Sequence, residues 1–184
     1  MTTYYSDNFS AINPATGLED NTTLDTQKRV DAGIGHGRIR YKRAKVTFQQ
    51  LSGDSVRMMQ FRSSDRIIDV LIHSGNSGDT GRIDIGFRKS GVSHDGELVE
   101  ANIVCDAKLM TTAIAHASVF GAGVPDADFY RGKPIWEMVS MPGTGSPTIY
   151  TEDPMEDWDL SITFDEAFEV SISITVDVLY TSGD

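Results

Sequence analysis

The chain has 184 residues, of which 39% are hydrophobic, and its formal net charge is −11. This length is typical of a single domain that buries a core without disulfides or structural metals. The one cysteine, Cys105, excludes an intramolecular disulfide, and its apolar neighbours predict a buried core residue rather than a reactive thiol. No segment approaches the roughly 18 consecutive apolar residues of a transmembrane helix. The N-terminus lacks a signal peptide's basic flank and apolar run, so we expect a protein made in a cytoplasm and not held in a membrane.

The charge is unevenly distributed along the chain. Residues 1–27 hold four acids and no base, residues 28–133 hold all sixteen bases against twelve acids, and residues 134–184 hold eleven acids and no base. Such asymmetry predicts attraction between complementary surfaces, including surfaces of other copies of the chain. The acidic total weighs against nucleic acid as a partner, because phosphate contacts need a basic footprint.

Residues 1–35 form an arm by composition, and residues 36–184 form the folded domain. The arm is rich in Thr, Asn, Asp and Gly and has no apolar stripe. One interpretation is a disordered leader. The other is an arm that becomes ordered on a neighbouring subunit, with Tyr4, Tyr5 and Phe9 as anchors, because aromatic side chains bury a large apolar area at low entropic cost.

Four β-strands are predicted between residues 38 and 88, because apolar and polar residues alternate there. They are Arg38–Phe48, Ser55–Phe61, Arg66–His73 and Arg82–Arg88. In the first, Ile39 and Tyr41 share one parity and Ala44 the other, which predicts a β-bulge at Lys42-Arg43. The third is apolar on both faces, so we expect it in the centre of a sheet.

The middle of the chain is less regular. Leu98–Cys105 has the pattern of a strand. Asp106–Phe120 carries apolar residues at helical spacing, with Asp106 as a possible N-cap, although Thr111, Thr112 and Ile114 also suit a strand; we predict one short helix. Two short strands are then predicted at Ile135–Met141 and Thr148–Thr151.

The C-terminal residues show the clearest alternation. Apolar residues recur at every second position from Trp158 to Phe164 and again from Phe168 to Tyr180. Two such strands joined at Glu166-Ala167 predict an antiparallel hairpin with a buried face and an acidic, solvated face. The full set of strands predicts an all-β antiparallel sandwich of jelly-roll or Greek-key type, with an extended N-terminal arm and at most one short helix.

The chain carries no motif for catalysis, a cofactor or a metal. It has no phosphate-binding glycine loop and no nucleophile elbow, and its four histidines are far apart in sequence. The stretch Glu152–Asp159 fits either a solvated acidic loop or a calcium site. The pairs Asp126/Asp128 and Asp157/Asp159 are weak candidates for paired catalytic carboxylates. We therefore predict a structural or binding protein rather than an enzyme.

Five basic residues fall within the first predicted strand: Arg38, Arg40, Lys42, Arg43 and Lys45. With the bulge, these side chains are expected to continue along one side of the strand. Such a row is either a solvated strand face or a surface that docks onto an acidic partner protein.

A set of short patterns in order resembles the small virion structural proteins that tailed phages encode near the major capsid protein, some of which are capsid decoration, or cement, proteins. The patterns are Arg38–Tyr41, Ser63–Ile67, Asp84–Phe87, Ile135–Met138 and Trp158–Phe164. The resemblance spans residues 37–180, and the chain departs from the family pattern in its arm and in the acidic insert Glu152–Asp159.

The resemblance implies a non-enzymatic β-sandwich on the surface of a phage head, commonly a homotrimer, whose partners are the major capsid protein and its own copies. It implies no cofactor and no membrane. Two alternatives remain open. One is another virion component with a β-sandwich, such as a tail, neck or head-fibre subunit. The other is a carbohydrate-binding module or small β enzyme.

Overall fold

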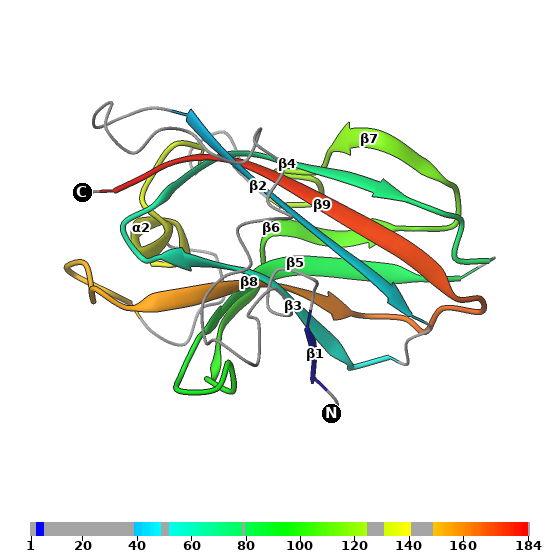
Figure 1. Cartoon of the computed structure of the whole chain (residues 1–184), viewed down its shortest axis with the longest axis horizontal. Helices are drawn as coiled ribbons and strands as arrows, with labels where there is room; N and C mark the ends of the chain where they lie inside the picture. The colour runs from blue at the N-terminus through cyan, green and yellow to red at the C-terminus, as the bar shows by residue number, and fades with distance from the viewer. Residues whose placement is uncertain are drawn as a thin grey trace, which may run out of the picture.

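The computed structural model describes residues 3–5, 39–48, 52–78, 80–124, 131–140 and 149–183. The strands are β1 (Thr3–Tyr5), β2 (Ile39–Phe48), β3 (Ser55–Arg62), β4 (Arg66–Ser74), β5 (Arg82–Lys89), β6 (Leu98–Leu109), β7 (Ile114–Ser118), β8 (Asp157–Phe164) and β9 (Ile172–Thr181), with one short helix, α2 (Ile135–Val139). They form a five-stranded sheet in the order β1-β3-β8-β5-β6 and a four-stranded sheet in the order β2-β9-β4-β7 (Figure 1). All pairs are antiparallel except β1 with β3. The predicted all-β sandwich is confirmed.

The core lies between the two sheets. Alternate residues of the central strands point inward and are fully buried: Ile83, Ile85 and Phe87 of β5, Leu160 and Ile162 of β8, and Ile174, Val176 and Val178 of β9. At one end of the core the rings of Phe61 and Tyr180 meet edge to face, with centroids 5.1 Å apart. This contact joins the two sheets, because Phe61 belongs to β3 and Tyr180 to β9.

Several predicted strands are confirmed. β3, β5 and β6 begin at the predicted residues, and β4 is an interior strand between β9 and β7, as its apolar composition predicts. Cys105 is a buried core residue in β6, as expected, and burial raises the pKa of its thiol to about 12. The thiolate that a reactive cysteine needs is therefore disfavoured.

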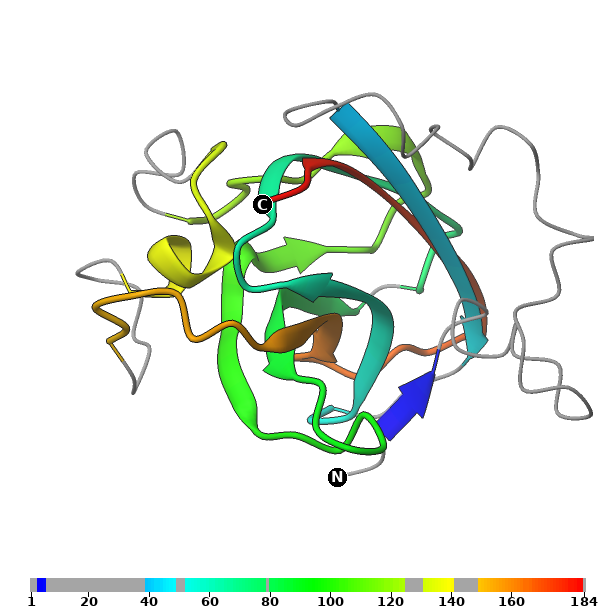
Figure 2. The ribbon, with the colours of Figure 1, turned by 60° about the vertical axis from the view of Figure 1, so that its left-hand side comes forward.

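The predicted C-terminal hairpin is wrong. β8 pairs with β3 and β5, whereas β9 pairs with β2 and β4 in the other sheet. In Figures 1 and 2, β8 (orange) and β9 (red) run in different layers. Both alternations are real, since each strand buries one face against the core, but an alternation identifies the inward face and not the neighbouring strand.

The predicted helix at Asp106–Phe120 is also wrong. This segment forms the end of β6 and the strand β7, and His116 in β7 has a positive φ of 52°. Met110, Val119 and Phe120 are buried, but they directly follow the ends of two different strands, β6 and β7, and do not share one helix face. The β-branched residues in the segment favour this outcome.

Conversely, a strand is predicted at Ile135–Met141, but the structure forms the helix α2 there, at Ile135–Val139. Ile135, Met138 and Val139 are buried, which is the i, i+3, i+4 spacing of a helix face. Pro134 precedes the first helical residue, a position where proline is tolerated. Residues 149–151 form no strand, contrary to the second short strand predicted there.

The predicted bulge at Lys42-Arg43 is absent. β2 pairs with β9 in one uninterrupted register from Ile39 opposite Thr181 to Phe48 opposite Ile172. Because Ala44 is fully buried, the regular alternation places Arg40 and Lys42 on the inward side. Ile39, although apolar, faces outward and is 59% exposed.

The N-terminal arm is described only at β1, where Thr3 lies opposite Ser55 and Tyr5 opposite Arg57 in β3 of the same chain. Of the predicted anchors, Tyr4 and Tyr5 are in this strand, and Phe9 lies outside the described residues. No helix in the described parts of the chain is long and apolar enough to span a membrane.

Candidate functional site

A polar hollow lies between the edges of the two sheets, where β2 approaches β3; we call it the edge pocket. Its volume is about 520 Å³. β2 is the last strand of its sheet, and β3 is paired on its outer side only by the three residues of β1 in the described chain. The charged groups lining the pocket are Arg40, Lys42, Arg62, Asp65 and Asp157.

Lys42 reaches across this pocket from one sheet to the other. Its Nζ donates a hydrogen bond to the carbonyl oxygen of Gln60 in β3. The ammonium group also lies 4.4 Å from the ring centre of Phe61 and 5.1 Å from that of Tyr180. Burial lowers the pKa of Lys42, because a desolvated ammonium loses hydration, although Asp65 and Asp157 act in the opposite direction.

The carboxylates of the pocket do not neutralise its cations in pairs. Asp65 is 5% exposed and accepts backbone N–H bonds from Arg62 at 3.0 Å and Gly183 at 3.2 Å. Within the described chain, neither Arg40, Lys42 nor Arg62 forms an ion pair with a carboxylate. The pocket therefore combines three cations with two acids and carries a formal charge of +1.

A second polar cluster lies on the outward face of the four-stranded sheet. Asp177 of β9 is only 1% exposed and accepts bonds from Tyr41 Oη at 2.5 Å, Arg43 Nε at 2.6 Å and His116 Nε2 at 2.7 Å. Burial acts to raise the pKa of Asp177, but the bonds from Arg43, Tyr41 and His116 outweigh it and hold the pKa below its ordinary value. Burial and Asp177 raise the pKa of Tyr41 to about 12.

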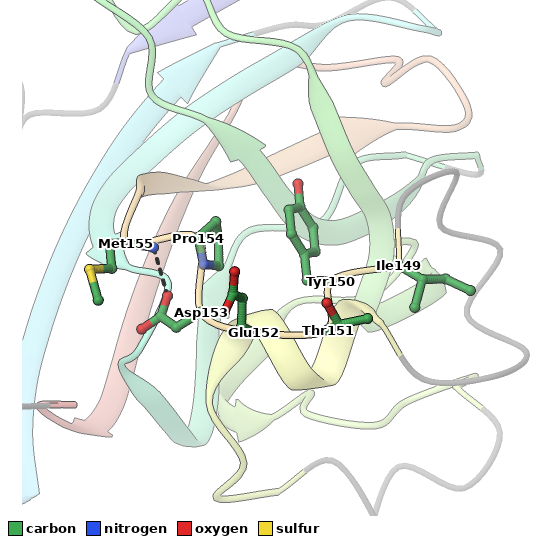
Figure 3. Close-up of a pocket in the computed structure, with 7 residues that line it drawn as sticks. All are labelled: Ile149, Tyr150, Thr151, Glu152, Asp153, Pro154 and Met155. Atoms are coloured by element: carbon green, nitrogen blue, oxygen red, sulfur yellow. Dashed lines mark hydrogen bonds between the residues drawn. The ribbon is translucent and has the colours of Figure 1, made fainter.

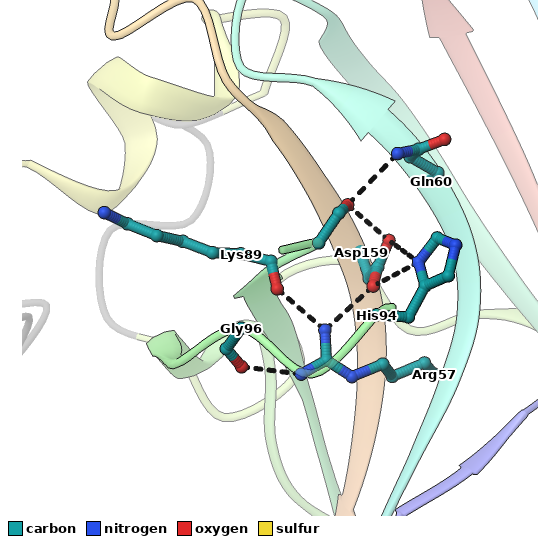
Figure 4. Close-up of polar contacts among 7 residues, drawn as sticks. Arg57, Gln60, Lys89, His94, Gly96 and Asp159 are labelled. Atoms are coloured by element: carbon teal, nitrogen blue, oxygen red, sulfur yellow. Dashed lines mark hydrogen bonds and ion pairs between the residues drawn. The ribbon is translucent and has the colours of Figure 1, made fainter. Parts of the chain in front are cut away.

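A buried ion pair lies beneath the loop of residues 90–97 (Figure 4). Arg57 of β3, 2% exposed, donates to Asp159 of β8, 0% exposed, at 2.8 Å. Arg57 also bonds the carbonyl oxygen of Gly96 at 2.6 Å, and Asp159 accepts from Ser90 Oγ at 2.6 Å and pairs with His94 Nδ1 at 2.9 Å. These contacts fasten the loop to the sheet.

A second hollow, of about 510 Å³, is lined by residues 149–155 (Figure 3). Ile149 and Met155 are exposed there, while Asp153 accepts a bond from Ser63 Oγ and another from the Met155 N–H at 2.9 Å. The acids of the proposed calcium stretch thus enter separate contacts, since Asp159 belongs to the Arg57 pair. Across the described residues, no group of three or more His, Cys, Asp or Glu side chains is placed to hold a metal ion.

The five basic residues predicted as one row are divided between different places. Arg40 and Lys42 line the edge pocket, Arg43 is bound to Asp177, Lys45 is exposed on the outward face, and Arg38 lies outside the described residues. The expected single-sided row is therefore wrong, because it depended on the bulge. Sequence reasoning missed Asp177, since a polar residue within an alternating strand reads as solvated. It singled out Asp159 only as a candidate catalytic carboxylate or calcium ligand, whereas the structure buries Asp159 in the ion pair with Arg57.

No family model matches the sequence, and no curated protein matches it. The chain aligns with chains of several solved phage capsids. One, in the capsid of Ralstonia phage GP4, aligns with a TM-score of 0.57 and 11% identity over 82% of this chain and 88% of that chain. A chain of the cyanophage Pam1 capsid aligns with a TM-score of 0.41 and 12% identity, over 87% of this chain and 98% of that chain. A chain of the Helicobacter pylori bacteriophage KHP30 capsid aligns with a TM-score of 0.37 and 13% identity, over 82% of this chain and 92% of that chain. The last two scores are too low to support a conclusion, and the first shows that this fold occurs in a phage capsid.

Proposed function

We propose that this chain is a non-enzymatic structural protein of a tailed-phage virion, and that it decorates the outer surface of the head and stabilises the shell. The observation that carries the proposal is the similarity in fold to a chain of the Ralstonia phage GP4 capsid, which extends over most of both chains. The similarity is global, so the two chains are of comparable length and neither is a small part of the other. This agrees with the virion resemblance in the sequence.

The physical features of the sandwich are compatible with a shell-binding role. The chain joins acidic ends to a basic middle, and such charge asymmetry favours association with oppositely charged surfaces of other proteins or of other copies. A decoration protein stabilises a shell by binding its assembled form, and each bound copy adds stability by mass action. The proposed partners are the major capsid protein and further copies of the chain.

The outward face of β2 is the attachment surface that we propose within this role. Ile39, Arg43 and Lys45 are all exposed on this face, and Arg43 forms an ion pair there with Asp177. An exposed lysine at the rim of an interface mainly accelerates association, and its effect decreases as salt screens it.

Sedimentation of the purified protein with undecorated heads tests the proposal. We expect saturable binding that weakens with salt and with Lys45→Glu, while Lys108→Glu in the other sheet has little effect. Absence of binding to heads under all conditions contradicts the decoration role. Binding that survives both Lys45→Glu and about 1 M salt, where screening is nearly complete, moves the attachment surface away from β2.

The copy number per virion separates the decoration role from the other virion roles. A head decoration protein is expected in hundreds of copies, located on the surface of the head. A neck or fibre subunit is expected in far fewer copies, and a tail-tube protein purifies with tails. A glycan array tests the carbohydrate-binding alternative.

A further inference from the structure

The exposed large apolar side chains of the described chain gather at one end of the sandwich. There are seven of them, and the four most exposed are Val92 (102%), Met155 (90%), Ile149 (74%) and Ile39 (59%). These four, together with Leu98, lie at the end where β2, β6 and β8 begin and where β3, β5 and β9 finish; we call it the loop end. In Figure 1 it is the end at which the C-terminus is marked. Single exposed apolar residues are ordinary, whereas a group of them is typical of an interaction surface.

The two connections that carry most of these residues are held in fixed positions. Val92 lies in the loop of residues 90–97, and Ile149 and Met155 lie at the two ends of the segment 149–155 (Figure 3). Lys89 joins the two connections, since its Nζ lies 3.3 Å from Glu97 and 3.4 Å from Glu156. A surface that is already rigid loses little conformational entropy when a partner covers it.

Charges of both signs are nearly balanced at the loop end, although the chain has a net charge of −11. Seven bases and eight acids belong to the described segments that meet there, which are residues 39–42, 62–66, 89–98, 131–137, 149–157 and 180–183. At the opposite end, four acids and one base belong to the described residues of 52–54, 75–82, 110–113 and 164–171. Copies of an acidic chain repel each other least where the local charge is balanced, and a surface with both signs can complement itself.

We propose that the loop end is an interface between copies of this chain, in which the loop end of one copy covers that of another. The exposed apolar residues supply the area removed from water, and the balanced charges allow two acidic chains to approach. A strongly basic or acidic partner would be complemented by an excess of the opposite charge, which the loop end lacks. Folding of the single chain does not explain Val92 and Met155, because side chains so exposed contribute little to its core.

Sedimentation velocity of the purified protein tests the proposal with four variants that each add one negative charge. Val92→Glu and Met155→Glu are expected to weaken self-association at least about tenfold, because the contact would then bury an unpaired charge. Leu109→Glu and Val170→Glu are the matched controls, since these two exposed apolar residues lie at the opposite end. The controls are expected to change self-association less than about twofold, because substitutions outside an interface are nearly neutral.

All four substituted side chains are exposed, so the variants are expected to keep the urea midpoint of the unaltered protein. An unaltered chain that remains near its single-chain mass of 20.1 kDa at all concentrations overturns the proposal. Equal effects at the two ends, or a larger effect of the controls, also overturn it.

Site-specific cross-linking tests whether the same ends meet. Cys105 is buried and the pKa of its thiol is raised to about 12, so an introduced exposed cysteine is the reactive one. With a short bismaleimide, Met155→Cys is expected to give a covalent dimer and Val170→Cys is expected to give little. Equal yields at the two positions, including none at either, overturn the contact between loop ends.

This inference deepens the proposed function and rests on it for the biological role of the contact, because copies of the chain are among the proposed partners. Both assays use purified protein without heads. Loss of the loop-end contact therefore leaves head binding to be judged by sedimentation with heads, and failure to bind heads leaves the loop-end contact to be judged here.

Discussion

At the scale of single residues, the two most buried carboxylates have different neighbours and support different elements. Asp159 lies under the 90–97 loop and is bound by Arg57, Ser90 and His94. Asp177 lies on the opposite sheet and is bound by Tyr41, Arg43 and His116. Each is buried because donors from several segments replace water, as a buried charge requires.

Removal of one partner from the Asp159 ion pair is expected to lower the free energy of unfolding. Arg57→Met leaves Asp159 charged and buried without its cation, so we expect the free energy of unfolding to fall by about 3–5 kcal/mol. The exposed pair of Arg82 and Glu166 is the control, and Arg82→Met is expected to cost about 0–1 kcal/mol. Urea denaturation measures both. Equal losses in the two variants contradict the assignment of Arg57 as a buried anchor.

The Asp177 cluster predicts a contribution to acid stability. The pKa of Asp177 is lower in the folded chain than its ordinary value near 4, so its stabilising contribution is complete above about pH 4 and is lost as the pH falls through the folded pKa. We expect Asp177→Asn to lower stability at neutral pH and to flatten the decline in stability on the acid side. Denaturant midpoints between about pH 2 and 7 measure this. An acid decline as steep in the variant as in the unaltered protein contradicts the prediction.

At the scale of elements, the sequence predicts which face of a strand is buried far better than which strand lies beside it. The alternation of Ile83, Ile85 and Phe87 in β5 correctly identifies the inward face. The same signal in β8 and β9 suggested a hairpin, and only the pairing shows that residues 165–171 cross between sheets. Pairing depends on contacts between segments distant in sequence, which local periodicity does not contain.

The candidate sites were predictable only in part for the same reason. The cluster of basic residues in the first strand was visible, but the continuous register of β2 divides it between two faces. The contact of Lys42 with Phe61 and Tyr180 joins three strands, and no local spacing relates those positions. The bulge was predicted because the apolar Ile39 and the apolar Ala44 have opposite parity. Ile39 faces solvent, since an edge strand need not follow the core pattern strictly.

The inward assignment within β9 gives a direct test at this scale. Ile174 is fully buried, so Ile174→Ala is expected to lower the free energy of unfolding by about 2–5 kcal/mol. Ser173 lies on the other face, where its Oγ is 2.6 Å from Thr47 Oγ1 near solvent, and Ser173→Ala is expected to cost about 1 kcal/mol or less. Equal shifts of the urea midpoint mean that the two faces are assigned wrongly.

At the scale of the whole molecule, the fold leaves surfaces that suit association. The outer edge of β2 has no strand beside it in the described chain, and Ile39 is exposed there. The virion resemblance implies a trimer, so we expect light scattering at micromolar concentration to give about 60 kDa, three times the 20.1 kDa of one chain. A mass near 20 kDa at all concentrations contradicts a stable oligomer in solution.

The central claim, that this sandwich coats a phage head, is tested most directly by electron cryo-microscopy of heads that contain the protein and heads from which its gene is deleted. The difference map is expected to show density on the outer surface of the shell, repeated with the head's symmetry and large enough for the two-sheet sandwich. Deletion is also expected to lower the temperature at which the heads rupture, because bound copies stabilise the assembled shell. An unchanged head surface, with the missing density in the tail, the neck or nowhere in the virion, contradicts the claim.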